Sequence, residues 1–197
     1  TNTCTDPAGR VWVIDPIDGT NNFIAGFGNF AVCIALLVGG EPVVGVVHDV
    51  TRDLTYRAAK GHGAFANDRP VACLKTPLSA SSVLLTTANN LRPDGTIPPF
   101  VHRWMSQIHW KIRILGSAAI EASLVGAGAA HGAVTLNGKL WDVAAAAAIV
   151  LEAGGRIVDL GGNDLFPFDL KDYKGAKTPF LACAPNATDA IVREMQT

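Results

Sequence analysis

The chain has 197 residues, of which 49% are hydrophobic and 17% are charged, and its formal net charge is −1. This composition excludes an intrinsically disordered chain and is typical of a globular protein with a large core. The near-neutral charge gives no basic surface, so we expect neither nucleic acid nor an acidic membrane as a partner. No uncharged apolar run approaches the ~18–20 residues that span a bilayer. The polar start of the chain also lacks a signal peptide, and we expect a soluble protein.

The cysteines and histidines are scattered along the chain. The four cysteines form no CxxC pair, and no two of the five histidines have the i, i+4 spacing of a helical metal site. We therefore expect reduced thiols in a cytoplasmic protein, with no disulfide framework and no zinc site.

The first 77 residues predict an antiparallel meander of short strands. The expected strands cover Val11–Ile14, Asn29–Leu37, Val43–Val47, Leu54–Ala59 and Gly63–Ala66. The second and third of them are apolar on both faces, which is typical of strands covered by helices on both sides.

After Pro77 the pattern changes to alternating strands and helices. Strands are expected over Ser82–Thr86, Lys111–Leu115, Ala130–Leu136, Arg156–Leu160 and Thr178–Cys183. Helices are expected over Pro98–His109, Ser117–Val125, Leu140–Ala153 and Asn186–Gln196. The change predicts two parts, residues 1–77 and residues 78–197, packed together as an α+β layered fold.

A possible metal site follows the first strand, in the segment WVIDPIDGTNNF that begins at Trp12. Asp15 and Asp18 stand three residues apart, and Gly19 permits a positive φ. Thr20–Asn22 offer N-caps for a short helix. Mg²⁺ requires oxygen ligands on a rigid scaffold, and a helix N-terminus attracts phosphate. The segment thus predicts a metal and phosphate site, with an ordinary strand-exit turn as the alternative.

A second carboxylate stands in the segment WDVAAAAAIVLEAGG, where Asp142 lies at the beginning of the expected helix. A carboxylate is favoured there by the helix dipole. In the alternative interpretation Asp142 is simply an N-cap and Trp141 a core anchor.

These two segments closely resemble the two signatures of the inositol monophosphatase family, and a third matching piece, Ile114–Ala119, lies between them. The similarity covers nearly the whole chain in the right order. It implies a layered αβαβα sandwich of the sugar-phosphatase type. It also implies Mg²⁺-dependent hydrolysis of a small phosphate monoester, inhibition by lithium, and a homodimer.

The resemblance assigns metal ligands residue by residue. It implies that Asp15 and Asp18 bind and bridge Mg²⁺ ions and that the backbone carbonyl of Ile17 completes one of the sites. Asp142 would hold the second ion from the opposite side.

The resemblance also implies how substrate is held. The amides of Gly19 and Thr20 would receive the phosphate, and Thr20 would help to orient the attacking water. Gly116, Ser117 and Ala118 would line the side that holds the substrate alcohol. The reaction would be an in-line attack by metal-activated water, without a phosphoenzyme.

The sequence departs from the family in its first residues. The family has an N-terminal helical segment ending in a Glu-Glu pair, and one of these glutamates binds metal and positions the water. Here fourteen residues precede Asp15, and none is Glu. We expect that the segment is missing from this sequence; a naturally shortened relative is the alternative, in which catalysis would be poor.

Two further departures concern the substrate and the helix. His131 and Thr135 stand where the family has the Asp and Glu that contact inositol, which leaves histidinol phosphate or a sugar bisphosphate such as fructose 1,6-bisphosphate open. Lys139 could meet a second phosphate, although a solvated lysine in a turn is the simpler interpretation. Ala145–Ala148 replace a stretch that usually carries glycine, which should tighten the helix.

Three rival functions are weighed against this interpretation. An aspartate-nucleophile phosphatase needs two acids two residues apart, whereas Asp15 and Asp18 are three apart. A serine hydrolase built on Ser117 lacks the second glycine of a nucleophile elbow. A catalytically impaired relative with a binding role would fit the missing glutamates but not the retained acids.

Overall fold

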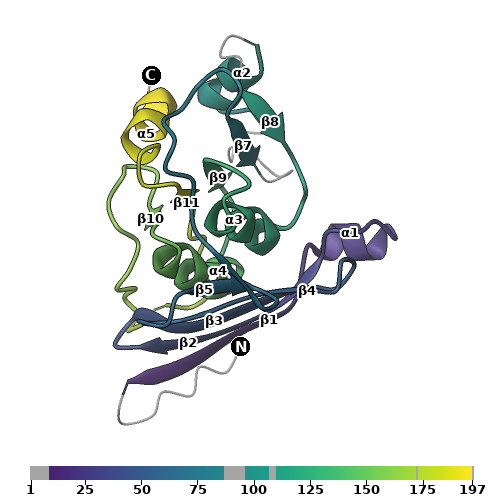
Figure 1. The fold of residues 1–197 in the computed structure, drawn as a ribbon, viewed down its shortest axis with the longest axis vertical. Coiled ribbons are helices and arrows are strands. Elements are labelled where there is room, and N and C mark those ends of the chain that lie inside the picture. Colours follow the sequence, from purple (N-terminus) through teal and green to yellow (C-terminus); the bar gives the residue numbers. More distant parts are fainter. Residues whose placement is uncertain (1–8, 87–95, 107–109, 172, 197) are drawn as a thin grey trace.

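The computed structural model describes residues 9–86, 96–106, 110–171 and 173–196. Its elements stack as layers in the order first sheet, pair of helices, second sheet and outer helices (Figure 1). The predicted α+β layered fold is therefore confirmed.

The first sheet is an antiparallel meander of six strands in chain order. The strands are β1 Arg10–Asp18, β2 Ala31–Val38, β3 Glu41–Asp49, β4 Leu54–Ala59, β5 Ala64–Ala66 and β6 Arg69–Val71. The meander was predicted, whereas β6 was not. β6 is three residues long and contains Pro70, and a proline is tolerated there because β6 is an edge strand.

The second sheet has five strands in the order β10-β11-β9-β7-β8. They are β7 Val83–Thr86, β8 Lys111–Arg113, β9 Gly132–Thr135, β10 Arg156–Val158 and β11 Phe180–Cys183. β7 is parallel to both β8 and β9, and β11 is antiparallel to β9 and β10. The carboxyl ends of β7, β8 and β9 therefore lie at one edge of the sheet, from which short loops lead into α3 and α4.

The helices of the described residues lie on the two sides of the second sheet, except the shortest, which follows β1 at the end of the first sheet (Figure 1). They are α1 Thr20–Ile24, α2 Pro99–Ser106, α3 Ala118–Gly126, α4 Leu140–Glu152 and α5 Thr188–Gln196. α3 and α4 lie between the sheets, and α2 and α5 lie on the far side of the second sheet (Figure 1). The four longer helices were predicted within a few residues. The last three residues of the helix expected to end at His109 lie outside the described residues.

α4 packs closely against the first sheet because both sides of the contact are small. A β-carbon at Gly45 of β3 would lie 2.8 Å from the β-carbon of Ala148 and still closer to the backbone oxygen of Ala145. The alanine run that replaces the family's glycine is fully buried, so it combines high helix propensity with close packing. This packing fixes the beginning of α4 beside β1.

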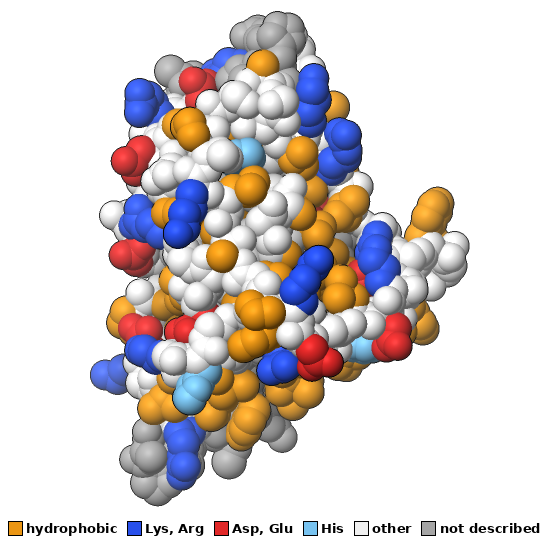
Figure 2. Space-filling view, viewed as in Figure 1, with side chains coloured by type: hydrophobic (Ala, Val, Ile, Leu, Met, Phe, Trp, Pro, Cys, Tyr) orange, Lys and Arg blue, Asp and Glu red, His pale blue; other side chains and the backbone are white. Residues whose placement is uncertain are grey.

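The other face of the first sheet corrects one expectation. We expected helices on both faces, but the side chains of β2 alternate strictly between buried and partly or fully exposed. Trp12 and Ile14 of β1 are 58% and 53% exposed, and Ile34 of β2 is 37% exposed. Figure 2 shows hydrophobic side chains gathered at the lower edge of the molecule, over this sheet. So apolar a surface is typical of a face that another segment or chain covers.

Three other expectations concern the whole chain. Within the described residues, no helix is both long enough and apolar enough to cross a bilayer. Cys33, Cys73 and Cys183 are buried free thiols, and Cys4 lies outside the described residues. The change of sheet falls between Val71 and Val83, but the division of the chain at residue 77 into two parts stays a prediction.

Candidate metal centre

β1 is irregular where it carries its two aspartates. In a regular strand, residues three apart point to opposite faces. The pairing with β2 shifts register between Asp15 and Asp18, and both side chains are buried on the side that faces the helices. We expected the strand to end at Asp15, but it continues through the irregularity to Asp18. The extra residue places both carboxylates on one side of the sheet.

Asp142 reaches the same place from α4. It is the third residue of the helix, and Lys139 is the N-cap. The Asp142 carboxylate accepts a hydrogen bond of 2.8 Å from the backbone N–H of Lys139. This contact caps the helix and fixes the carboxylate. Asp142 can therefore cap α4 and still offer an oxygen to a metal ion.

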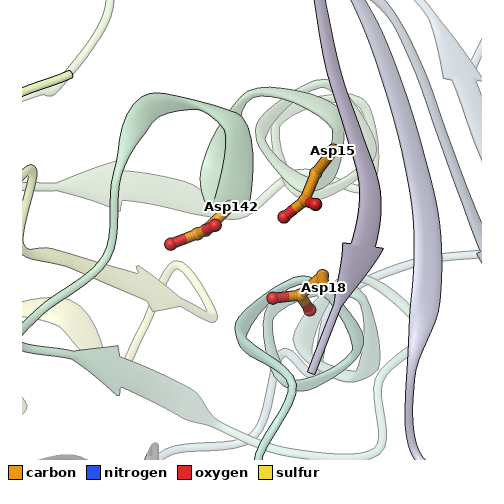
Figure 3. Close-up of side chains that lie close together, drawn as sticks. All are labelled: Asp15, Asp18 and Asp142. Carbon is orange, nitrogen blue, oxygen red and sulfur yellow. The ribbon is translucent and has the colours of Figure 1, made fainter. Parts of the chain in front are cut away.

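The three carboxylates meet beside the beginning of α4. One ligand atom from each of Asp15, Asp18 and Asp142 lies within 4.8 Å of the others, and Figure 3 shows the three side chains together. Among the described residues, this is the group of acidic, histidine or cysteine side chains that could hold a metal ion. The sequence had proposed all three as ligands, from segments more than a hundred residues apart.

Backbone and hydroxyl donors hold each carboxylate in place. One Asp18 oxygen accepts hydrogen bonds from the Ser117 hydroxyl and from the Ala119 N–H, the latter at 2.9 Å. One Asp15 oxygen accepts the Ile17 N–H at 3.0 Å. These hydrogen bonds fix the carboxylates of Asp15 and Asp18 at the centre.

Burial makes the charged forms of these side chains unfavourable. Desolvation raises the pKa of Asp18 to about 6, against the hydrogen bonds from Ser117 and Ala119, which lower it. Desolvation also raises the pKa of Asp142 to about 7, helped by the negative charges of the other two aspartates. The pKa of Asp15 is raised too, mainly by burial.

This arrangement fits a hard divalent cation. Three carboxylates so close together, two of them buried and Asp142 half-buried, repel one another, and a cation between them would remove both the repulsion and the cost of burial. The donor set contains oxygen atoms only, which suits Mg²⁺, Mn²⁺ or Ca²⁺ better than zinc.

The loop after Asp18 differs from expectation in its capping. Thr20, Asn21 and Asn22 were expected to supply an N-cap, but the N-cap of α1 is Gly19, without a side-chain hydrogen bond. Gly19 has φ +84°, and a β-carbon there would lie 2.8 Å from the oxygen of Asn29, so the chain requires glycine. The Thr20 hydroxyl donates to the Ile17 carbonyl at 2.9 Å, which brings two of the proposed site residues together.

The segment expected to contact the substrate alcohol lies against Asp18. Ser117 is fully buried and Ala118 nearly so, so their side chains do not face an incoming molecule. The Ser117 hydroxyl donates to Asp18, which also argues against Ser117 as a hydrolase nucleophile. Contact with a substrate would have to come from the backbone of Gly116–Ala118.

Three further residues were expected to bear on substrate specificity, and each has a different position. Thr135 ends β9, at the edge of the sheet that leads to α4, and is 3% exposed. His131 precedes the same strand, about 13 Å away along it, and its ring contacts the Thr76 hydroxyl at 3.2 Å. Lys139 is the N-cap of α4, is half-buried, and has its ammonium 4.8 Å from the centre of the Trp141 ring, a cation–π contact.

Sequence reasoning missed two polar residues that support the site. Asn22 donates to the carbonyls of Leu115 and Asn29, at 2.7 and 2.9 Å. Glu121 is fully buried in α3 and accepts the N–H groups of Leu115 and Gly116, at 2.8 and 3.1 Å. The signal for Glu121 was available, because it is a lone charge in the apolar helix AAIEASLV. Nothing in the sequence distinguished Asn22 from Asn21.

Comparison with known proteins identifies the family. The profile of the inositol monophosphatase family matches residues 2–196. The chain belongs to this family. The family assignment confirms the resemblance of the three segments and disfavours the aspartate-nucleophile and serine-hydrolase alternatives.

Individual relatives agree with the family assignment. The fructose-1,6-bisphosphatase/inositol-1-monophosphatase of Thermotoga maritima is 39% identical over 159 residues, which are 81% of this chain and 60% of that protein. Inositol monophosphatase 1 of Bos taurus is 37% identical over 162 residues, 81% of this chain and 57% of that protein. The solved structure of a Thermotoga maritima IMPase, 34% identical, superposes with a TM-score of 0.82 over 97% of this chain and 70% of that one. The chain thus spans 60% or less of the length of these two curated relatives.

Proposed function

We propose that this protein hydrolyses a small phosphate monoester with the help of Mg²⁺. The observation that carries the proposal is the cluster of Asp15, Asp18 and Asp142, whose ligand atoms lie within 4.8 Å of one another in a member of this family. The raised pKa values of Asp18 and Asp142 support the proposal, because burial and neighbouring negative charge disfavour the bare carboxylates.

The chain's own groups would hold the cation. Asp15 and Asp18 would bind it from β1 and Asp142 from α4, with the carbonyl of Ile17 as a further ligand. Mg²⁺ in such a site supplies Lewis acidity, which activates water and neutralises charge on the phosphoryl and leaving oxygens. Ser117 and Ala119 would keep Asp18 oriented through their hydrogen bonds.

Residues beside the cluster would receive the substrate. We propose that the amides of Gly19 and Thr20 bind the phosphate. The Thr20 hydroxyl, which donates a hydrogen bond to the Ile17 carbonyl, would help to orient the attacking water. The backbone of Gly116–Ala118 would face the alcohol. No side chain forms a covalent bond with phosphorus in this proposal.

The substrate class is proposed as inositol-phosphate-like, with two alternatives. Thr135, at the carboxyl end of the central strand β9, offers a hydroxyl where the family has an acid, which weakens the case for inositol itself. A relative whose name includes fructose-1,6-bisphosphatase is 39% identical, which supports a sugar bisphosphate as the alternative, and histidinol phosphate remains a second one. Lys139 would be the residue to test for a second phosphate.

Other properties follow from the family resemblance alone. We propose inhibition by Li⁺ through competition with Mg²⁺, a homodimer, and action in the cytoplasm, where buried free thiols such as Cys33 would stay reduced. Light scattering at several protein concentrations would test the dimer, and activity at high Li⁺ would test the inhibition.

Phosphate release with and without Mg²⁺ tests the function. The substrates would be inositol 1-phosphate, histidinol phosphate and fructose 1,6-bisphosphate, with Asp142→Asn as the inactive control. Mg²⁺-dependent release by the wild type alone supports the proposal and names the substrate class. Cation binding without release from any substrate, both by this chain and by one extended to the length of its relatives, would favour a binding relative. A trapped aspartyl phosphate would overturn the mechanism in favour of a nucleophilic aspartate.

A further inference from the structure

Glu121 is a buried acid that the proposed reaction does not use. It lies in the first turn of α3, is fully buried, and has a pKa raised by burial to about 8. One of its oxygens accepts the N–H groups of Leu115 and Gly116, and the other has no hydrogen-bond partner among the described residues. A buried carboxyl of this kind lowers stability unless its contacts offset the cost.

The contacts of Glu121 lie on the segment that supports Asp18. Leu115 and Gly116 lead directly into Ser117, whose hydroxyl donates to Asp18. Gly116 has φ +82°, a conformation that the two hydrogen bonds to Glu121 help to maintain. The position of Ser117 therefore depends on the turn that Glu121 holds.

Asn22 contacts the same turn from the other side. Its amide donates to the carbonyl of Leu115 at 2.7 Å, and a β-carbon at Gly116 would lie 2.8 Å from its nitrogen. The residue before Ser117 is thus enclosed between Glu121 and Asn22. Gly19, next to Asp18, completes the contact, because a β-carbon there would lie 3.2 Å from that of Ser117.

We propose that Glu121 is a positioning residue for the cation centre: through Leu115 and Gly116 it fixes Ser117 and the first turn of α3 on Asp18. The inference rests on the proposed function, since it gives the supported carboxylate a cation to bind. Hydrogen bonds to the groups around a metal ligand typically contribute about 10–100-fold to metal affinity.

The structure supplies a matched control for this role. Glu152, at the end of α4, also accepts two backbone N–H groups of a glycine-containing loop, those of Gly61 and Gly63, at 2.9 and 3.0 Å. It lies more than two helical turns from Asp142. Glu152→Ala therefore removes the same kind of loop contact without touching the support of Asp18.

The test measures Mn²⁺ affinity by electron paramagnetic resonance and amide hydrogen exchange by NMR in the same samples. Glu121→Ala should speed exchange of the Leu115 and Gly116 amides and weaken Mn²⁺ binding by about tenfold or more. Glu121→Gln keeps an acceptor oxygen and should restore both to near the wild-type values. Glu152→Ala should leave both unchanged.

The possible results distinguish the positioning role of Glu121 from the proposed function. Wild-type Mn²⁺ affinity in Glu121→Ala, despite faster exchange at Leu115 and Gly116, would overturn the positioning role and leave the proposed function intact. Weaker binding in Glu121→Ala from a wild type that binds Mn²⁺ but releases no phosphate would support the role and overturn the function. A wild type that binds no Mn²⁺ would overturn both. If Glu121→Ala does not fold, Glu121→Asp, one methylene shorter, should show the same loss, and unchanged affinity in that variant would overturn the role.

Discussion

The Ser117 hydroxyl donates a hydrogen bond to the carboxylate of Asp18, across 99 residues of sequence. The bond joins the end of β1 to the beginning of α3, the two elements on either side of the candidate centre. It stabilises the charged form of Asp18 and so opposes the effect of burial on its pKa. Because of this hydrogen bond, a cation bound by Asp18 should depend on Ser117 even if Ser117 does not contact the cation.

Ser117→Ala should therefore weaken cation binding at neutral pH. Removing the donor raises the pKa of Asp18 further, so a larger fraction is protonated and the affinity should fall by about tenfold. Raising the pH to 8.5 should recover part of the loss. Titration calorimetry with Mn²⁺ at both pH values checks this. The control is Ser123→Ala, because Ser123 is equally buried in α3 but its hydroxyl has no hydrogen-bond partner in the part of the chain that the structure describes. Equal affinities of wild type and Ser117→Ala at pH 7 would contradict the prediction.

Asp142→Asn should separate stability from function. Without metal the change removes a half-buried negative charge near Asp15 and Asp18, so the melting temperature in EDTA should rise by a few degrees. With Mg²⁺ at 100 times its Kd, the wild type should gain about 2.7 kcal/mol, whereas the variant should gain little. Its activity should fall at least about a hundredfold. Differential scanning calorimetry with and without Mg²⁺ measures the two effects on stability. A Mg²⁺-induced shift in the variant equal to that of the wild type would mean that Asp142 is not part of the site.

The ligands were predictable from sequence because they are marked locally. Asp15 and Asp18 follow a hydrophobic run, and Asp142 begins a long alanine-rich helix. Their meeting within 4.8 Å could be proposed only from the family resemblance, since the two segments are more than a hundred residues apart. The register shift in β1 that puts both strand aspartates on one face has no marker in the sequence beyond a proline.

The supporting residues were not predictable for a different reason. The Asn22 amide donates to the carbonyl of Leu115, 93 residues away, and neither residue type predicts this contact. The alternation in β2 between buried and exposed side chains was hidden because both faces are apolar. The pattern indicated a covering layer on each side, but a sequence pattern does not say which segment or chain provides it.

The pH dependence of stability follows from the raised pKa values. Burial raises the pKa of Asp18 to about 6 and that of Asp142 to about 7, above the ordinary value of 3.8. The folded, metal-free protein therefore holds these protons more tightly than the unfolded chain. The stabilising effect of the two bound protons is present below pH 4 and is lost as the pH rises from about 4 to about 7, at a cost on the order of a few kcal/mol for each side chain.

Melting temperatures of wild type and Asp142→Asn in EDTA check this sign, because their difference cancels titrations elsewhere in the protein. The advantage of the variant should grow from pH 4 to pH 7 and then level off. Saturating Mg²⁺ should reverse the trend, since cation and proton compete for the same oxygens and the cation wins at higher pH. An advantage independent of pH would mean that Asp142 titrates normally.

Gly45→Ala tests the packing that places α4 beside β1. Gly45 has an ordinary strand conformation, so the substitution acts through space rather than through backbone strain. The added methyl group would overlap the backbone oxygen of Ala145 and come within 2.8 Å of the Ala148 side chain. Moving a helix by this much should cost about 1–3 kcal/mol or more in the free energy of unfolding, measurable by urea denaturation, and should displace Asp142 enough to weaken cation binding.

Adding Ala148→Gly to Gly45→Ala identifies the contact responsible. The second change removes the side-chain overlap but leaves the closer overlap with the Ala145 oxygen. Because the nearest atom belongs to the helix backbone, the double variant should not recover, and glycine inside a helix should cost about a further 1 kcal/mol. Recovery of stability in the double variant would mean that the side chain of Ala148, and not the path of the helix backbone, sets the distance between α4 and the first sheet.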